Sequence, residues 1–478
     1  MKTGDGGGAL RGAGIIPILI TVFIACFMDG LDGSILNSAL PSIAEAFHAD
    51  VGSVSWVSLA YLLTVAGTLL IFGKFASRGH LKELFVVGIL FFILGSFICG
   101  LTYSLALLVI SRVIQGLGAS MLLSCCSVIC VRYLPEKVRG LAFGLITVAT
   151  FVGITIGPLL GGIVTTSLSW EWIFIINVPI GLIGLIYSLL SLPADRPEGK
   201  TERFDGMGAL LLFLAMLSGV FILERLPKQS ITDPQMLIFV ILFVTAAVLF
   251  VIVSLKRKNP FFNIRIFKIK ALTAMILGAF ILQVVFAGII YLLPFFITNQ
   301  YDADPVMRGV LLSIQPAVTA LLGGVFGKWS DVRGRRVFCI AGCGLLVALS
   351  GAFALLDGTY GIIPFIITLV TAGICFAMVS GPSSGRIVDV TPKEEQETSA
   401  TIAVACMYLS SVVGTAVFSA IFTQITAGNG VVVSFGDLPD EVFRLGFAGS
   451  MLFGAALAVI AVILYILVKE KKPEGGKE

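Results

Sequence analysis

The sequence predicts an all-α integral membrane protein with 14 transmembrane helices, arranged as two six-helix halves plus two extra helices. Three observations predict it. The 478 residues are 57% hydrophobic and only 13% charged, whereas soluble domains have about 25% charged residues. Fourteen apolar stretches approach or exceed the roughly 20 residues that a membrane-spanning helix needs. A basic loop motif recurs 254 residues further along the chain.

The apolar stretches divide the chain into an N-terminal half (1–192), a linker with two extra spans (193–270) and a C-terminal half (271–478). The segment 204–224 has the weakest signal, because glycines interrupt it. A helix lying on the membrane surface is the alternative there, but its length favours a span. The predicted spans lie near 15–37, 52–73, 84–103, 105–133, 139–165, 171–192, 204–224, 236–255, 271–297, 306–328, 337–356, 361–382, 399–425 and 446–468.

Lys and Arg indicate the orientation in a cell membrane. With the N-terminus inside, the inside loops and tails hold 27 basic residues, and the outside loops hold only Arg225, Lys228, Arg308 and Arg444. This asymmetry follows the positive-inside rule, so we expect both termini to be cytoplasmic. The formal charge of +4 then reflects topology and not nucleic-acid binding. The basic stretch 256–270 is expected to face anionic lipid.

The sequence gives no sign of an enzyme or of a cofactor. All nine cysteines fall within predicted spans and there are only two histidines, so we expect neither a metal site nor disulfides. No GxxxxGK[ST] loop is present for ATP. Any transport would therefore use an ion gradient or the gradient of the substrate itself.

The repeated loop motif indicates an internal duplication. The first copy is GKFASRGHLK and the second is GKWSDVRGRR. A single copy could be an ordinary basic loop. Two copies at matching places predict two related halves around a central cavity, as in many secondary transporters. The residues that we assign to the motif are Gly73, Arg78 and Lys82 in the first copy, and Gly327, Asp331, Gly334, Arg335 and Arg336 in the second.

Two further segments have unusual residues for a membrane span. The stretch LLVISRVIQGLGAS places Arg112 and Gln115 in a span, where an arginine is costly and therefore a functional candidate. The stretch GITIGPLLGG forms a small-residue face beside a proline that bends the helix. That face comprises Gly153, Gly157 and Gly161, with Pro158 and Gly162 beside it.

These motifs together resemble the major facilitator superfamily over the whole chain. LDGSILNSALP, WVSLAYLL and WEWIFIINVPIG resemble segments of its 14-spanning drug:proton antiporters of the QacA/EmrB type, although Glu171 stands where an Arg is usual. The resemblance implies a proton-driven exporter of lipophilic, often cationic compounds. We expect the protein to act as a monomer.

Two acidic residues lie clearly within a predicted span, Asp29 and Asp32, and they share one helix face. We place Asp32 about 8 Å and Arg112 about 10 Å below the outer ends of their helices. They can pair if these helices face each other, which the resemblance implies. Asp29 lies about 4.5 Å deeper and has no evident partner. Desolvation favours its neutral form, so it could exchange a proton for a cation. A purely structural ion pair is the alternative.

The C-terminal half has no comparable membrane acid, so its candidate cavity groups are uncharged. An apolar cavity with one or two acids suits a lipophilic monocation or a neutral amphiphile and suits a sugar poorly. Two alternatives remain: a transporter of one metabolite or organic ion on the same fold, and a membrane sensor or scaffold that transports nothing. The substrate-binding candidates are Asp29, Gln115, Gln283, Tyr291, Gln315 and Tyr408, with Ser313 as a further cavity group.

Overall fold

The computed structural model describes residues 14–77, 79–193, 205–226, 229, 232–257, 264–390, 396–429 and 434–467. Regular structure in these ranges is helical. Fourteen segments among them are helical, long and apolar enough to cross a membrane, in agreement with the 14 predicted spans. Arg78 of the first loop motif lies outside the described residues.

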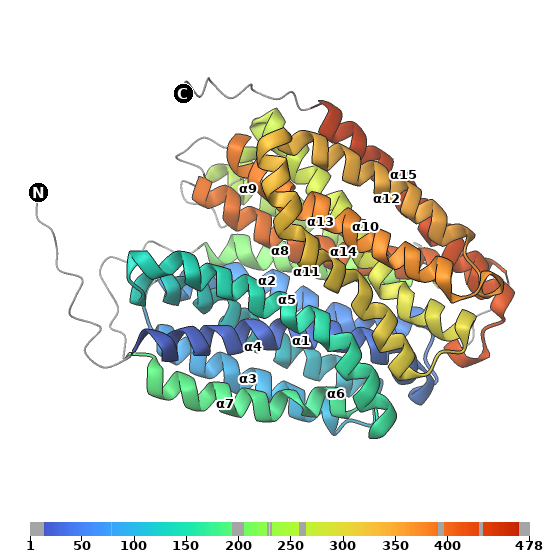
Figure 1. Ribbon diagram of the computed structural model, residues 1–478, viewed down its shortest axis with the longest axis horizontal. Helices are drawn as coiled ribbons and strands as arrows, with labels where there is room; N and C mark the ends of the chain where they lie inside the picture. The colour runs from blue at the N-terminus through green and yellow to red at the C-terminus, as the bar shows by residue number, and fades with distance from the viewer. Residues whose placement is uncertain are drawn as a thin grey trace, which may run out of the picture.

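The N-terminal half is built around α1, which packs along α5 over much of its length. In Figure 1 this half forms the lower layer of the bundle, in blue to green. The predicted sixth span is a continuous membrane-crossing unit made of α6 and α7, which meet at Ile176. Its helices are α1 (Ile15–Ala46), α2 (Val51–Ser77), α3 (Leu81–Gly100), α4 (Leu105–Tyr133), α5 (Glu136–Ser167), α6 (Trp172–Ile175) and α7 (Asn177–Ser191).

The C-terminal half forms the upper layer in Figure 1, in yellow to red. Its main helix pairs are α11 with α13, α12 with α15, and α10 with α14. A short 3₁₀ helix, η2 (Ile264–Lys268), precedes it, and two others, η3 (Gly358–Tyr360) and η5 (Phe435–Asp437), lie in its loops. The long helices are α10 (Lys270–Tyr301), α11 (Pro305–Arg333), α12 (Arg335–Leu355), α13 (Ile362–Val390), α14 (Gln396–Gly428) and α15 (Asp440–Leu467).

The two extra helices lie beside the junction of the halves. Helix α8 (Gly206–Arg225) contacts α2 of one half and α14 of the other, and α9 (Pro234–Lys256) packs on α8. The glycines of α8 do not interrupt it. Phe213 of α8 occupies the space above Gly67 of α2, where no side chain would fit. The pair therefore covers the seam between α2 and α14.

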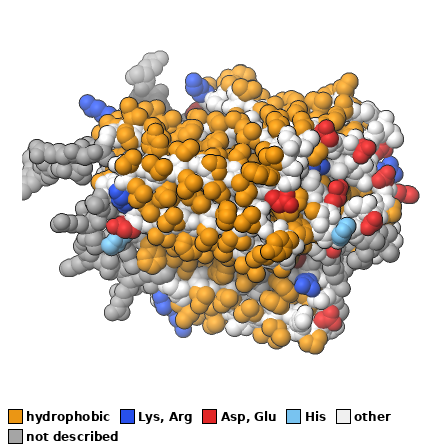
Figure 2. All heavy atoms as spheres, turned by 90° about the horizontal axis from the view of Figure 1, so that it is seen from below, with side chains coloured by type: hydrophobic (Ala, Val, Ile, Leu, Met, Phe, Trp, Pro, Cys, Tyr) orange, Lys and Arg blue, Asp and Glu red, His pale blue; other side chains and the backbone are white. Residues whose placement is uncertain are grey.

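The surface matches a protein surrounded by lipid. Figure 2 shows a broad apolar band on one flank, with most charged side chains toward its two ends. Helix α9 contributes strongly exposed apolar side chains such as Ile238 and Ile241, which are 62% and 63% exposed. Such an apolar band is expected where lipid tails replace water as the solvent.

The two halves are in close contact at one end of the bundle. We call the end opposite the chain termini the distal end; it lies on the right of Figure 1. There Gly162 of α5 contacts the backbone of Pro305, and Gly309 of α11 contacts the backbone of Pro158. Toward the terminal end, a β-carbon added at Gly144 of α5 or at Gly323 and Gly327 of α11 would meet no atom of the described residues within 4 Å.

The small-residue face of α5 is turned toward α1. A β-carbon at Gly153 would lie 2.6 Å from the carbonyl oxygen of Phe27, and one at Gly161 would lie 2.6 Å from that of Ile35. Gly157 lies against Ser34 in the same way. The glycines thus allow α1 and α5 to touch backbone to backbone, which fixes the position of the acidic residues on α1.

Candidate functional site

Asp32 lies at the centre of a buried polar cluster. One carboxylate oxygen accepts a 2.7 Å hydrogen bond from Nη1 of Arg112. The other accepts from the side-chain amides of Gln115, at 2.6 Å, and Asn177, at 2.9 Å. Asp32 and Arg112 are 0% and 1% exposed. A buried ion pair with these additional donors is well compensated for the loss of water.

Arg112 is held by neighbours from two further directions. Its Nε donates to the backbone oxygen of Val57 at 3.0 Å, and its guanidinium carbon lies 4.3 Å from the centre of the Tyr61 ring. Gln115 also donates to Ser96 at 2.8 Å. Helices α1, α2, α3, α4 and α7 therefore all contribute to this cluster.

The structure brings Asp32 and Arg112 together, but the sequence-based depth of Asp32 was wrong. Helix α1 continues through Pro41 to Ala46 instead of ending near residue 37. Asp32 consequently lies near the middle of α1 and not close to its outer end. The helix continues because its last two turns are packed among apolar residues, including Leu40 and Ile43, which are fully buried.

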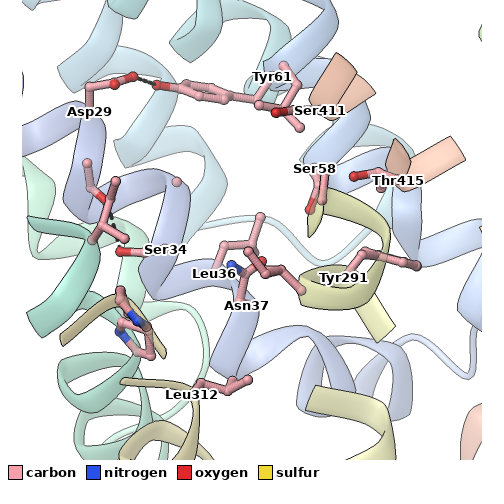
Figure 3. A pocket seen from close by; sticks show the side chains of 18 of the residues that line it. Asp29, Ser34, Leu36, Asn37, Ser58, Tyr61, Tyr291, Leu312, Ser411 and Thr415 are labelled. Carbon is pink, nitrogen blue, oxygen red and sulfur yellow. Dashed lines mark hydrogen bonds between the residues drawn. The ribbon is translucent and has the colours of Figure 1, made fainter. Parts of the chain in front are cut away.

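Asp29 has partners that the sequence did not suggest. The Tyr61 hydroxyl donates to one of its carboxylate oxygens at 2.8 Å, and the Tyr408 hydroxyl donates to the other at 3.3 Å. Tyr61 is on α2 and Tyr408 is on α14, so the two halves meet at this carboxylate. Asp29 is only half-buried, and Figure 3 shows it facing Tyr61 at the edge of a cavity.

The cavity has a volume of about 280 Å³ and lies between the two halves. Of the predicted binding residues, Asp29, Gln283, Tyr291, Gln315 and Tyr408 line it, and Arg112 contributes to its wall. Gln115 lies behind the wall in the Asp32 cluster, and Ser313 is not among the lining residues; its hydroxyl donates to the Gly309 carbonyl.

The lining surface is largely apolar, as expected, but it includes more polar side chains than the sequence analysis named. Three side-chain amides, from Asn37, Gln283 and Gln315, face the space. The Ser58 hydroxyl is buried without a hydrogen-bond partner among the described residues. Several further hydroxyls come from different helices, and Figure 3 shows part of this arrangement. The lining hydroxyl residues are Ser34, Ser58, Thr150, Ser411 and Thr415, together with Tyr61, Tyr291 and Tyr408.

Arg308, which the sequence analysis placed in an outside loop, is a buried residue of α11 and is only 2% exposed. Its Nε donates to the Ser38 carbonyl at 2.6 Å, and Nη2 donates to the Ser42 hydroxyl at 3.0 Å, both on α1. Nη1 donates to Thr298 of α10 at 2.6 Å. The distal contact between the halves thus includes a buried cation whose three acceptors are uncharged.

The loop-motif residues attach helix ends at the terminal end. In the second copy, Arg335 pairs with Asp331 at 2.8 Å, and Arg336 donates to the last carbonyls of α15. In the first copy, Lys82 donates to the Leu189 carbonyl near the end of α7 at 2.7 Å. Cations at helix C-termini are favourable because they offset the helix dipole. Gly334 has φ 95°, a conformation that favours glycine.

Comparison with known proteins identifies the family. The family model described as Major Facilitator Superfamily matches residues 22–415 and, in a second match, 275–478. The chain belongs to the major facilitator superfamily. Its all-helical fold and its cavity between two halves are therefore those of a membrane transporter and not of an enzyme.

Among the similar relatives are transporters of different named substrates. The riboflavin transporter RibZ of Clostridioides difficile (strain 630) is 30% identical over 410 residues, which cover 85% of this chain and 88% of the relative. The multidrug resistance protein B homolog of Mycobacterium tuberculosis is 27% identical and covers 96% and 88%. The name of the Mycobacterium relative and that of multidrug resistance protein 3 of Bacillus subtilis agree with the predicted 14-span subfamily.

Solved structures support the fold. A bacterial homolog of the human lysosomal transporter Spinster, in an inward-facing and unoccupied conformation, superposes with a TM-score of 0.69 at 15% identity, covering 94% of this chain and 96% of the other. The peptide transporter POT in complex with sulfate gives 0.66 at 15% identity, covering 94% of each chain.

Sequence reasoning missed several polar residues of this major facilitator site. Tyr61 and Asn177 lie inside the segments WVSLAYLL and WEWIFIINVPIG, but neither was nominated. An Asn within an apolar span is itself a signal, because a buried amide needs partners. Asn37 likewise lies inside LDGSILNSALP without having been nominated, whereas Ser96 has no such context in the sequence. Among the described residues, no group of three His, Cys, Asp or Glu side chains could hold a metal ion.

Proposed function

We propose that this transporter is a proton-coupled antiporter that exports lipophilic, cationic or neutral amphiphilic compounds from the cytoplasm. The observation that carries the proposal is the placement of two carboxylates. Asp29 is half-buried and lines the cavity, whereas Asp32 lies beside it in a buried pair with Arg112. Asp29 can contact a substrate in the cavity, and Asp32 is affected through the buried residues that are bonded to it.

Asp29 is suited to exchange a proton for a cation. Its two tyrosine donors stabilise the ionised form, and its partial burial favours the neutral form. A cation that enters the cavity stabilises the ionised carboxylate and so favours release of the proton. Three tyrosine rings in the lining offer further attraction to a cation. Competition between proton and cation at one carboxylate gives antiport when the site is exposed alternately to the two sides of the membrane.

The positions of the basic residues support a cell-membrane location with both termini in the cytoplasm. In that orientation the distal end faces outward, and Arg308 and the contacts of Gly162 and Gly309 close the cavity on that side. A cavity that is closed outward would receive a compound from the cytoplasmic side. We expect the protein to work as a monomer, because the cavity is formed within one chain.

A second candidate function is transport of a polar, uncharged metabolite with several hydrogen-bonding groups. The three amides and the many hydroxyls of the lining favour it, since specific recognition of such a molecule requires placed donors and acceptors. The riboflavin transporter among the relatives adds support for a planar heteroaromatic compound.

Purified protein in liposomes with an imposed pH gradient tests these functions. A lipophilic cation, a neutral amphiphile and riboflavin are offered in turn, and proton release into a pH-sensitive dye is measured with substrate flux. Multidrug antiport predicts proton release with the first two compounds. Flux of riboflavin alone would favour the metabolite transporter. Absence of flux with all three would overturn the export proposal and favour a sensor or scaffold.

A further inference from the structure

Tyr61 touches both acidic sites at once. Its hydroxyl donates to Asp29 at 2.8 Å, at the edge of the cavity. Its ring lies 4.3 Å from the guanidinium carbon of Arg112, whose Nη1 is paired with Asp32. Tyr61 is only 2% exposed. A single rigid side chain therefore joins the carboxylate that meets the substrate to the buried ion pair.

The position of Tyr61 leaves it little freedom. Both its hydroxyl and its ring are engaged, and its own backbone oxygen lies 3.0 Å from where a side chain on Gly116 of α4 would begin. Helix α2 is therefore packed closely on α4 at this level, and any movement of the hydroxyl must move the ring as well. The face of the Tyr61 ring attracts cations, and its distance from the guanidinium of Arg112 can change.

The other groups near Asp29 do not form such a connection. From α14, Tyr408 donates to Asp29 at 3.3 Å. Among the described residues, the rings that contact Arg112 are those of Tyr61 and, at 5.7 Å, Phe174. The titratable and charged groups that surround Asp29 and its two tyrosines are Asp32 and Cys26 on α1, Tyr61 on α2, Arg112 and Cys126 on α4, and Tyr408 on α14.

We propose that Tyr61 is the positioning residue that couples the charge of Asp29 in the cavity to the buried Asp32–Arg112 pair. This inference rests on the proposed proton-coupled function. When Asp29 is ionised, it accepts from the Tyr61 hydroxyl and holds the ring beneath Arg112. When a proton binds Asp29, that acceptor is weakened, and the Tyr61 ring is held less firmly beside Arg112. Proton binding at Asp29 thus reaches the buried pair through Tyr61.

Two variants separate this role from ordinary packing. Tyr61→Phe keeps the ring beside Arg112 and removes only the hydroxyl that reaches Asp29. Tyr408→Phe is the matched control, because it also removes one hydroxyl from Asp29 but leaves every contact of Arg112 unchanged. A third variant, Tyr61→Leu, removes the hydroxyl and the ring together.

The full-length variants are compared with the wild type in liposomes by three measurements: protons released per substrate, substrate exchange without a pH gradient, and the pH midpoint of exchange. For Tyr61→Phe we expect the ratio of proton-driven transport to exchange without a pH gradient to fall by about tenfold or more, the size expected for one hydrogen bond to a charged group. Its pH midpoint should rise by about one unit, since ionised Asp29 has lost a donor.

Tyr408→Phe should shift the pH midpoint in the same direction but keep the wild-type ratio of protons to substrate. Tyr61→Leu should lose coupling as Tyr61→Phe does. The inference is overturned if Tyr61→Phe keeps the wild-type ratio, or if Tyr61→Phe and Tyr408→Phe lose coupling equally. Wild-type protein that moves substrate without protons would instead overturn the proposed function, and the inference with it. Thermal unfolding of each variant in detergent verifies that it is folded.

Discussion

The Tyr408 hydroxyl donates a 3.3 Å hydrogen bond to Asp29, and this bond joins α14 of the C-terminal half to α1 of the N-terminal half. Because it crosses between the halves, a relative movement of the halves must lengthen or break it. The bond also depends on the charge of Asp29, since an ionised carboxylate is the stronger acceptor. The charge of Asp29 and the relative position of the two halves therefore affect the same hydrogen bond.

Asp29→Asn should weaken transport of cationic compounds and spare neutral ones. Asn keeps the size of Asp and can still accept from one tyrosine, but it gives no charge to attract a cation. Loss of one direct ionic contact corresponds to about 1.5–3 kcal/mol, or roughly 10- to 100-fold in apparent affinity. The measurement is efflux of one cationic and one neutral lipophilic dye in the same cells. Equal loss of both dyes would show that Asp29 is needed for the proton coupling of every substrate and does not select cations.

Asp32→Asn should abolish proton-coupled export and lower stability. The new amide group would face the donors of Gln115 and Asn177, and Arg112 would be left buried without its anion. Breaking a buried pair from one side costs about 3–5 kcal/mol. Thermal unfolding and pH-driven efflux measure the two effects.

Removing both charges, in Asp32→Asn with Arg112→Gln, should recover part of the stability without recovering coupling. If Asp32→Asn still exports substrate at the wild-type rate under a pH gradient, Asp32 has only a structural role.

Gly157→Leu should block transport, whereas Gly144→Leu on the same helix should not. A side chain at Gly157 meets Ser34 and the backbone of Ile35, while one at Gly144 meets nothing within 4 Å. Overpacking of this kind costs about 1–3 kcal/mol or more, and the exposed site should change by less than about 1 kcal/mol. Efflux rate and melting temperature are compared for the two variants. Similar behaviour of both would mean that α1 and α5 need not stay in contact during transport.

Arg308→Met should loosen the distal contact between the halves. Met fills part of the same space but cannot donate the hydrogen bonds that Ser38, Ser42 and Thr298 accept from Arg308. In a protein with its native cysteines replaced, an Ala287→Cys reporter in the cavity should react about tenfold faster or more with a thiol reagent applied from the distal side.

The matched control for Arg308 is Arg444→Met. Arg444 pairs with Asp357 at 3.1 Å, and both residues belong to the C-terminal half. Its loss should leave the labelling rate of the reporter unchanged, because no contact between the halves is removed. An equal increase in both variants would indicate general loosening of the distal loops rather than a specific role for Arg308.

Some of this protein could be predicted because lipid imposes simple rules on sequence. Fourteen spans follow from length and hydropathy, since each backbone group must be satisfied within its helix. Asp32 and Arg112 were identifiable as a candidate pair because charges in a span are costly unless they are paired. The repeated loop motif indicated two halves, which the family match supports.

The tertiary structure alone decided which helices meet and therefore what each polar residue does. Tyr61 and Tyr408 reach Asp29 from α2 and α14, 32 and 379 residues away in the sequence, and no local pattern encodes such contacts. Arg308 looks like a loop residue by position, but α1 continues beyond residue 37 and brings Ser38 and Ser42 to it. Hydropathy is a property of one helix, but a hydrogen bond between helices depends on where both of them pack.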